Sequence, residues 1–216
     1  IELPENFLKK TYQIIKKNKG LLICDEIQTG FGRIGEKFWG FELHDIIPDI
    51  VTLGKPMGNG HPIGAVVCTK EIAEKFNNGM EFFSSFGGNP VSCAIAISVL
   101  DELKKNKLQK NAKIVGEYIK SELIKLSNEF PIISDVRGKG LFIGFELTTR
   151  KLKPLEKEAK YLINRMKEYG ILMSSDGIDK NVIKVKPPLI FTKKNSNTLM
   201  FFLRKVLKED VMKIQL

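Results

Sequence analysis

The sequence predicts an α/β fold, because short apolar runs alternate with stretches of helical period. The runs at 21–24, 50–53 and 65–68 are continuous and apolar, as expected for parallel strands covered on both faces. A helical pattern over 4–18 precedes the first run. In alternating helix–strand folds, functional groups lie at the carboxyl ends of the strands. The residues just after these runs are therefore the first candidates for a site.

The second half of the chain predicts a different arrangement. Two predicted helices, 90–103 and 108–129, follow the last of the apolar runs. From Pro131 onward the pattern is that of an α+β domain. Its predicted strands are 132–138, 141–147, 171–173 and 182–185, and its predicted helices are 155–169 and the segment from 193 onward. We therefore expect two domains, one over 1–130 and a smaller one over 131–216.

Composition is typical of a globular protein and narrows the function classes. The 216 residues are 43% hydrophobic, and no run approaches the ~18 apolar residues of a membrane span. The net charge of +10 comes mostly from Lys spread along helices, whereas nucleic-acid binding usually clusters Arg with aromatics. Three scattered cysteines support neither a disulfide framework nor a metal site. We expect a cytoplasmic protein without nucleic-acid or membrane partners, and leave open a targeting segment.

A carboxylate and an amine stand at the ends of two predicted strands. Asp25 follows the run at 21–24, and Lys55 follows the run at 50–53. A pyridoxal phosphate (PLP) enzyme needs such a pair, since its lysine forms a Schiff base with the cofactor aldehyde and its carboxylate keeps the pyridine nitrogen protonated. A helix-capping Asp and an exposed Lys explain the same two residues. The pair alone leaves both interpretations open.

Three longer blocks surround this pair. They read Asp-Glu-Ile-Gln-Thr-Gly-Phe-Gly-Arg-Ile-Gly over 25–35, Leu-Gly-Lys-Pro-Met-Gly-Asn-Gly-His-Pro-Ile-Gly-Ala over 53–65, and Ser-Ser-Phe-Gly-Gly-Asn-Pro over 84–90. In order and spacing they resemble the class III aminotransferases of fold type I, from about Gly20 to the C-terminus. The resemblance implies the C-terminal part of the large PLP-binding α/β domain, followed by the small α+β domain.

The resemblance also assigns expected roles. Lys55 would bond the cofactor, and Asp25 would contact its pyridine nitrogen. Ile27 would pack on the ring face, and Gln28 would hydrogen-bond the phenolic oxygen. Ser85 stands where the family usually has Thr, which reaches the cofactor phosphate of the neighbouring subunit, so a homodimer is implied. A strand end with its turn, and a helix-capping serine, remain alternatives for Ile27, Gln28 and Ser85.

Lys184 departs from the family pattern. Members that act on amino acids commonly have Arg before a Pro-Pro pair, here Pro187-Pro188, to bind a substrate carboxylate. Lysine offers a point charge where Arg offers a bidentate fork, which puts carboxylate recognition in doubt. With the neighbouring motifs, this departure resembles the ethanolamine-phosphate and phosphohydroxylysine phospho-lyases. The substrate is expected to be a small amine or amino acid.

Other motifs are expected to be structural. The glycines at 30, 32 and 35 shape a loop, and His61 belongs to a turn. The other histidine, His44, is expected at the surface.

Three functions follow from the sequence. The first is transfer of an amino group by a PLP-dependent enzyme, and the second is elimination of phosphate by the same cofactor. The third is a non-catalytic dimerisation module of a larger fusion. The chain opens with Ile1 and has no counterpart of the family's phosphate loop or stacking aromatic. We therefore expect a C-terminal portion that is inactive and poorly soluble by itself.

Overall fold

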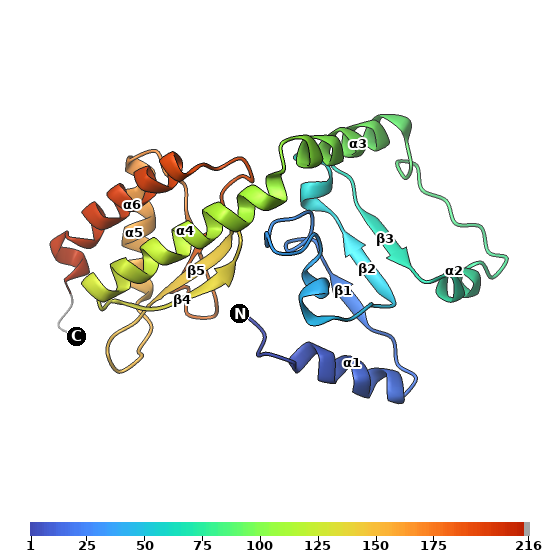
Figure 1. Ribbon diagram of the computed structural model, residues 1–216, viewed down its shortest axis with the longest axis horizontal. Helices are drawn as coiled ribbons and strands as arrows, with labels where there is room; N and C mark the ends of the chain where they lie inside the picture. The colour runs from blue at the N-terminus through green and yellow to red at the C-terminus, as the bar shows by residue number, and fades with distance from the viewer. Residues whose placement is uncertain (214–216) are drawn as a thin grey trace. The chain divides into compact units, whose positions relative to one another are not determined.

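The computed structural model describes residues 1–213, which form two compact units. One unit is Leu3–Gln109; the other begins at Lys110 and includes Ile1–Glu2 (Figure 1). Both units combine helices with a sheet, and the predicted mixed α/β class is confirmed. The domain boundary expected near residue 130 stays a prediction.

The first unit is built on a three-stranded sheet. Its elements are α1 (Phe7–Lys17), β1 (Ile23–Asp25), the 3₁₀ helix η1 (Gly40–His44), β2 (Ile50–Leu53), the 3₁₀ helix η2 (Lys55–Met57), β3 (Ala65–Cys68), α2 (Lys70–Phe76) and α3 (Pro90–Lys105). The strand order is β1-β2-β3, and β1 runs parallel to β2 with Ile23 opposite Ile50. Sequence reasoning predicted neither α2 nor the 3₁₀ helices.

The direction and coverage predicted for 65–68 are wrong. Strand β3 pairs antiparallel with β2, with Leu53 opposite Ala65. A parallel pairing needs a crossover, usually through a helix, whereas 54–64 contains only the short η2 and a series of turns. Val66 and Val67 of β3 are exposed, so in this chain the strand is not covered on both faces.

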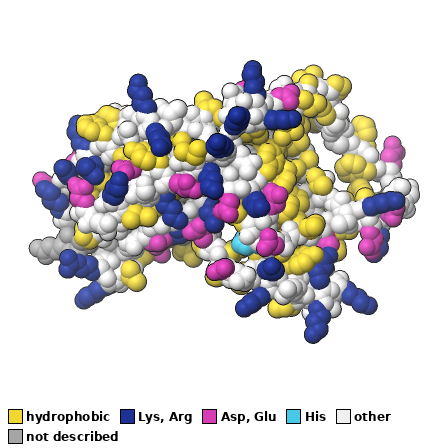
Figure 2. Space-filling view, viewed as in Figure 1, with side chains coloured by type: hydrophobic (Ala, Val, Ile, Leu, Met, Phe, Trp, Pro, Cys, Tyr) yellow, Lys and Arg dark blue, Asp and Glu magenta, His cyan; other side chains and the backbone are white. Residues whose placement is uncertain are grey.

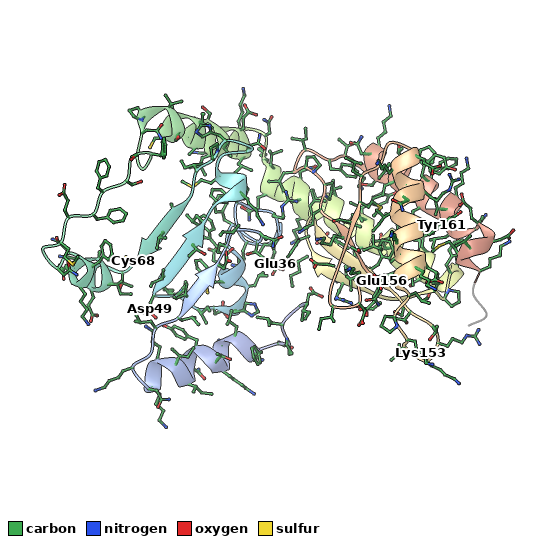
Figure 3. The ribbon with its side chains drawn as sticks, turned by 180° about the vertical axis from the view of Figure 1, so that it is seen from behind. Glu36, Asp49, Cys68, Lys153, Glu156 and Tyr161 are labelled. Atoms are coloured by element: carbon green, nitrogen blue, oxygen red, sulfur yellow. The ribbon has the colours of Figure 1, made fainter. Side chains whose placement is uncertain are left out.

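A buried carboxylate ties α1 to the sheet. Asp49 lies directly before β2, and its Oδ2 accepts a hydrogen bond of 2.8 Å from the backbone N–H of Leu22 (Figure 3). Its Oδ1 forms an ion pair with Lys16 near the end of α1. These two bonds hold the pKa of Asp49 below its usual range, and the ion pair raises the pKa of Lys16. The helix itself has no fully buried residue, so this polar contact is important for its position.

This contact predicts a pH dependence of stability. Because the folded-state pKa of Asp49 is depressed, its contribution is present above the unfolded value of 3.8 and is lost as pH falls through the lower folded value. Asp49→Asn should therefore destabilise the protein at neutral pH, and the difference from wild type should shrink below about pH 4. Urea unfolding from pH 7 to pH 2.5 measures this difference. Asp45→Asn, which alters an exposed pair with Lys9, is the control; an equal pH trend there would contradict the assignment.

The second unit contains a four-stranded antiparallel sheet of order β4-β5-β7-β6. Its elements are α4 (Leu108–Glu129), β4 (Ile133–Lys139), β5 (Phe142–Leu147), α5 (Glu156–Glu168), β6 (Ser174–Asp176), β7 (Val182–Val185), α6 (Lys193–Leu207) and the 3₁₀ helix η3 (Asp210–Met212). Helix α4 begins two residues before the unit does. The core lies between sheet and helices, and its fully buried side chains include Ile119, Phe145, Leu162 and Leu203.

The strand predicted at 171–173 is wrong, because these residues follow the cap of helix α5 and lie outside the sheet. Gly170 adopts a φ of +75° after α5, and the N–H of Ile171 bonds the carbonyl of Met166 at 3.0 Å. This is the hydrogen bond that closes a Schellman motif. Ile171 and Met173 still pack against the core, which explains their apolar character. The strand itself is the following segment, Ser174–Asp176, paired with β7.

An ionic cluster fixes α5 to the segment after α6. Glu209 accepts hydrogen bonds from Arg165 Nε and Nη2 at 2.9 and 2.8 Å, and from the Tyr161 hydroxyl at 2.6 Å (Figure 3 labels Tyr161). Arg165 and Tyr161 hold the pKa of Glu209 below its ordinary value. A bidentate guanidinium–carboxylate pair of this kind is a strong and directional contact.

Gly116 is required by a close approach of α4 to the turn between β4 and β5. A Cβ at this position would lie 2.0 Å from the carbonyl oxygen of Gly140 and 2.2 Å from its carbonyl carbon. Helix propensity alone favours Ala over Gly by about 1 kcal/mol. We expect the clash to reverse that sign, with Gly116→Ala lowering the free energy of unfolding by about 2–3 kcal/mol. Urea unfolding measures it; Ser121→Ala, exposed on the same helix, should change stability by less than about 0.5 kcal/mol. A neutral Gly116→Ala would contradict the contact.

Charged side chains are distributed over the visible surface in Figure 2, where Lys and Arg alternate with Asp and Glu. Within residues 1–213, no helix is both long and apolar enough to cross a membrane.

Candidate active site

Two neighbouring strand ends form the candidate site in the first unit. Strands β1 and β2 are parallel, and Asp25, the last residue of β1, lies opposite Thr52. Lys55 follows three residues later, as the first residue of η2. Both side chains are exposed in this chain, while Gly54 is buried. The carboxylate and the amine therefore stand at the same edge of the sheet, as the sequence predicted.

Ile27 contacts both strand ends. Its N–H donates a 3.0 Å hydrogen bond to Asp25 Oδ1, which leaves Oδ2 of this carboxylate for another partner. The Cγ1 atom of Ile27 would be 3.6 Å from a Cβ built on Gly54, so the side chain packs beside the backbone that leads to Lys55. Gln28 follows and is exposed. Asp25, Ile27 and Lys55 are thus brought together by two adjacent strands.

Glu26 holds the loop that follows β1, and sequence reasoning missed it. The side chain is buried, with 3% of its surface exposed. Its Oε2 accepts from the Thr29 hydroxyl and the Gly40 N–H, and its Oε1 accepts from the Phe41 N–H, each at 2.8 Å. A buried carboxylate is stable only when it is hydrogen-bonded in this way. The local sequence shows only an acidic residue after a strand; nothing in its spacing indicates the partners at 40 and 41.

The glycine-rich loop packs tightly around aromatic side chains. A Cβ on Gly30 would lie 2.9 Å from the Trp39 ring, and one on Gly32, where φ is +75°, would lie 2.8 Å from Gln109 Cβ. Phe31 is buried and meets the Trp39 ring edge to face, with centroids 5.1 Å apart. Burial lowers the pKa of the neighbouring Arg33. The glycines are needed because the chain makes these close contacts.

Ser85 lies in the exposed segment between α2 and α3, outside the cluster of Asp25, Ile27 and Lys55. Lys184 lies in the other unit, on β7, where its Nζ is 3.2 Å from Asp176 Oδ2. The pKa of Asp176 is lowered by a hydrogen bond from the Gly177 N–H and by Lys184. The charge of Lys184 is therefore partly compensated within its own sheet.

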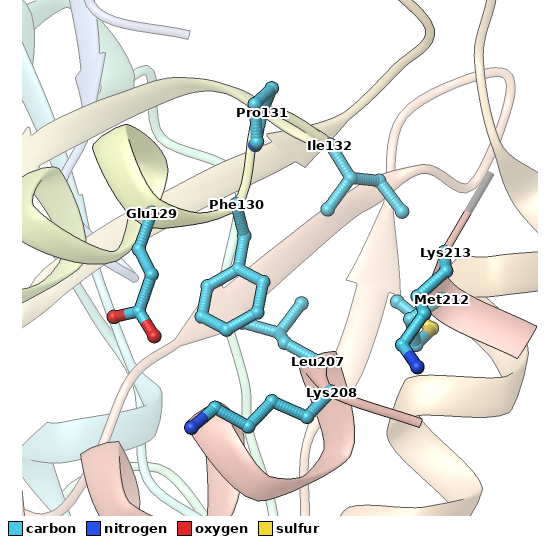
Figure 4. A pocket seen from close by; sticks show the side chains of 8 residues that line it. All are labelled: Glu129, Phe130, Pro131, Ile132, Leu207, Lys208, Met212 and Lys213. Carbon is cyan, nitrogen blue, oxygen red and sulfur yellow. The ribbon is translucent and has the colours of Figure 1, made fainter. Parts of the chain in front are cut away.

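Two pockets lie in the second unit. One, of about 600 Å³, is lined by Lys184, Lys186, Pro187 and Pro188 together with residues after α5 and from α6. The other lies where α4 and α6 end, and Figure 4 shows its lining residues: Glu129, Phe130, Pro131, Ile132, Leu207, Lys208, Met212 and Lys213. None of the predicted cofactor-binding residues lines either pocket.

The described residues hold no group of three or more His, Cys, Asp or Glu that could bind a metal ion. Burial and the nearby charge of Glu26 raise the pKa of Cys24 to about 11, so this thiol stays protonated at neutral pH.

The residues at the strand ends fit PLP chemically. An exposed amine, an exposed carboxylate and a branched apolar side chain occupy one edge of a parallel strand pair. Backbone packing between Ile27 and Gly54 fixes the apolar side chain relative to the lysine-bearing segment. PLP requires these three groups: an apolar side chain for its pyridine ring, a carboxylate for the ring nitrogen and an amine for its aldehyde.

The chain is similar to known enzymes over nearly all of its length. Residues 1–207 match the family described as aminotransferase class III. A Drosophila melanogaster protein named alanine–glyoxylate aminotransferase 2-like is 45% identical over 208 residues, covering 94% of this chain and 42% of that protein. An Arabidopsis thaliana protein, alanine–glyoxylate aminotransferase 2 homolog 2, mitochondrial, is 46% identical over 202 residues, covering 93% of this chain and 42% of the relative.

Solved structures show the same relationship. A phospholyase from Arthrobacter in complex with phosphoethanolamine superposes with a TM-score of 0.93 at 38% identity, covering 96% of this chain and 50% of that one. A Bacillus anthracis aminotransferase gives a TM-score of 0.90 at 29% identity, covering 96% of this chain and 49% of that one.

The chain spans about two fifths of the length of these curated relatives and about half of the solved chains. The expected match to the C-terminal part of the fold type I architecture is confirmed. The family depends on PLP. The chain belongs to the class III aminotransferase family.

Proposed function

We propose that this chain provides the lysine-bearing part of a PLP-dependent enzyme that transfers an amino group. The observation that carries the proposal is the parallel pairing of β1 with β2, which sets Asp25 and Lys55 at one sheet edge, with Ile27 in contact with both strand ends. The match to the class III family supports the same chemistry. The shared position supports a joint role for the pair over a capping Asp and an unrelated surface Lys.

Each residue has a separate task in this proposal. When bound, PLP supplies an electron sink for the substrate carbon that loses a proton. Lys55 Nζ would hold the cofactor at its aldehyde carbon and, as a free amine, would move a proton to and from the substrate carbon. Asp25 Oδ2, left open by the bond of Oδ1 to Ile27, accepts the hydrogen bond from the pyridine N–H. Ile27 covers a ring face and Gln28 donates to the phenolic oxygen.

Ser85 would contact the cofactor phosphate of a neighbouring subunit, which requires a homodimer. Its exposure in the segment before α3 supports a role between subunits. The aromatic side chains of Phe82, Phe83 and Phe86 in the same segment are between 75% and 85% exposed.

The cytoplasmic location expected from the sequence stays a prediction, since the Arabidopsis and human relatives are named as mitochondrial proteins.

A second candidate is phosphate elimination from a phosphorylated amine. It is favoured by Lys184, whose pairing with Asp176 leaves it poorly suited to bind a substrate carboxylate alone. The structural similarity to the Arthrobacter phospholyase, which was solved with phosphoethanolamine, supports the same alternative.

One assay separates the two. The complete protein is incubated with phosphoethanolamine, with and without an amino acceptor, and separately with alanine and glyoxylate. Pyruvate formation from alanine supports transamination, whereas phosphate release without an acceptor supports elimination. Lys55→Ala is the control for both reactions. Absence of both activities in a protein that binds PLP would contradict the proposed function.

A further inference from the structure

Lys55 lies in a segment that needs support from outside the sheet. Its φ is +32°, in the left-handed region that costs a non-glycine residue about 1–3 kcal/mol. The turn after it is closed by local hydrogen bonds, from the Met57 N–H to Gly54 O at 3.0 Å and from the His61 N–H to Gly58 O at 3.0 Å. Each of these hydrogen bonds joins residues only three apart in the sequence. They shape the turn, but they do not fix it relative to the rest of the unit.

His61 makes the longer-range contact. Its Nε2 lies 2.7 Å from the hydroxyl oxygen of Ser92, which is buried in the first turn of α3. A Cβ on Gly58 would lie 2.1 Å from the backbone carbonyl oxygen of His61, so the backbone of the turn from 58 to 61 is closely packed. The imidazole therefore connects the segment after Lys55 to a helix of sixteen residues.

Asn89 fixes the hydroxyl that His61 contacts. Asn89 Nδ2 donates to Ser92 Oγ at 2.9 Å and to the carbonyl of Phe86 at 2.7 Å, and Asn89 Oδ1 accepts from the Ser92 N–H at 2.9 Å. A hydroxyl has one donor and two acceptor sites. With one acceptor site used by Asn89, Ser92 can still donate to a neutral Nε2 or accept from an Nε2–H. The hydrogen bond between His61 and Ser92, here called the bridge, can therefore form whether or not Nε2 carries a hydrogen.

We propose that His61 is a positioning residue for Lys55, acting through its hydrogen bond to Ser92 and the Asn89 cap of α3. The bridge holds the turn that carries Lys55 against the first turn of α3, and so keeps the amine at the end of β2. Sequence reasoning treated His61 as a residue of the turn alone. The inference rests on the proposed function, because it assigns a role relative to the cofactor-bonding lysine.

The test combines His61→Phe, which keeps a ring without the nitrogen, with Ser92→Ala and the double variant. In the complete protein without cofactor, hydrogen exchange of the 55–63 amides should be about tenfold faster in each single variant. Covalent trapping of added PLP by borohydride should slow by a similar factor. In steady-state kinetics, the fold-decrease in kcat should exceed the fold-change in KM for the amine substrate. The double variant should be no worse than either single one, because both remove the same bond.

Two controls separate a positioning role from a general structural one. His61→Gln restores an amide near the Nε2 position and should recover most of the trapping rate. Ser98→Ala is the second control, because Ser98 is exposed on the same helix and its hydroxyl donates to the carbonyl of Ala94; it should leave all readouts unchanged. Wild-type exchange and trapping in His61→Phe and Ser92→Ala, or additive losses in the double variant, would overturn the inference. If Lys55→Ala still traps PLP, the proposed function itself fails instead.

Discussion

Replacing Lys55 with alanine should reduce turnover of the complete protein by at least about 10⁴-fold and remove borohydride trapping of PLP. The lysine is expected to supply both the covalent bond to the cofactor and the proton transfer, so its loss affects two steps. Lys55→Arg should be equally inactive, because a guanidinium keeps the charge but does not form that bond or exchange a proton at neutral pH.

Peptide mapping after borohydride reduction identifies the trapped residue, and steady-state kinetics gives the loss in rate. Lys70→Ala is the matched control, since this lysine begins α2 and its side chain is 90% exposed. Its turnover and trapping should equal those of wild type. PLP bound covalently at another lysine in Lys55→Ala would mean that Lys55 is an ordinary surface residue.

Asp25→Asn should lower turnover by about 10²–10³-fold while leaving part of the PLP bound. The substitution preserves the local fold, because an amide oxygen can still accept the hydrogen bond from the Ile27 N–H. It removes the negative charge that would stabilise a protonated pyridine nitrogen. The loss should therefore appear in the rate of the chemical step rather than in the stability of the protein.

Turnover, bound PLP and the urea unfolding midpoint should be measured on the same preparations. Asp101→Asn, exposed on α3, removes a carboxylate elsewhere in the unit and should be unaffected. Near-normal turnover of Asp25→Asn would show that the carboxylate serves the turn to Ile27 and has no contact with the cofactor. A urea unfolding midpoint lowered enough to account for the lost turnover would lead to the same conclusion.

The sequence predicted those parts of the fold that depend on short-range pattern. Asp25 and Lys55 could be placed at strand ends because Asp25 directly follows one apolar run and Lys55 follows another after a single glycine. Most helices appeared at the expected positions for the same reason, since caps and apolar period are local. The strand at 171–173 was misplaced because apolar residues that pack after a helix cap have the same composition as a short strand.

Features that depend on distant partners could not be predicted. The direction of β3 depends on the path of 54–64, and an apolar run carries no direction. Glu26 accepts hydrogen bonds from backbone amides fourteen and fifteen residues away, and His61 contacts Ser92, which is thirty-one residues away in the sequence. The sequence shows each of these residues, but only the folded chain shows which group each one contacts.

The attachment of α1 has a consequence for how this chain opens. A helix with no fully buried residue gains little free energy from apolar contacts, so its detachment is opposed mainly by the bonds of Asp49. Added salt or acid should release this helix while the sheet remains paired, in a partial opening that precedes global unfolding. The first trypsin cleavages would then fall after Lys16 and Lys17, and their rate would report ionic strength rather than the stability of the core.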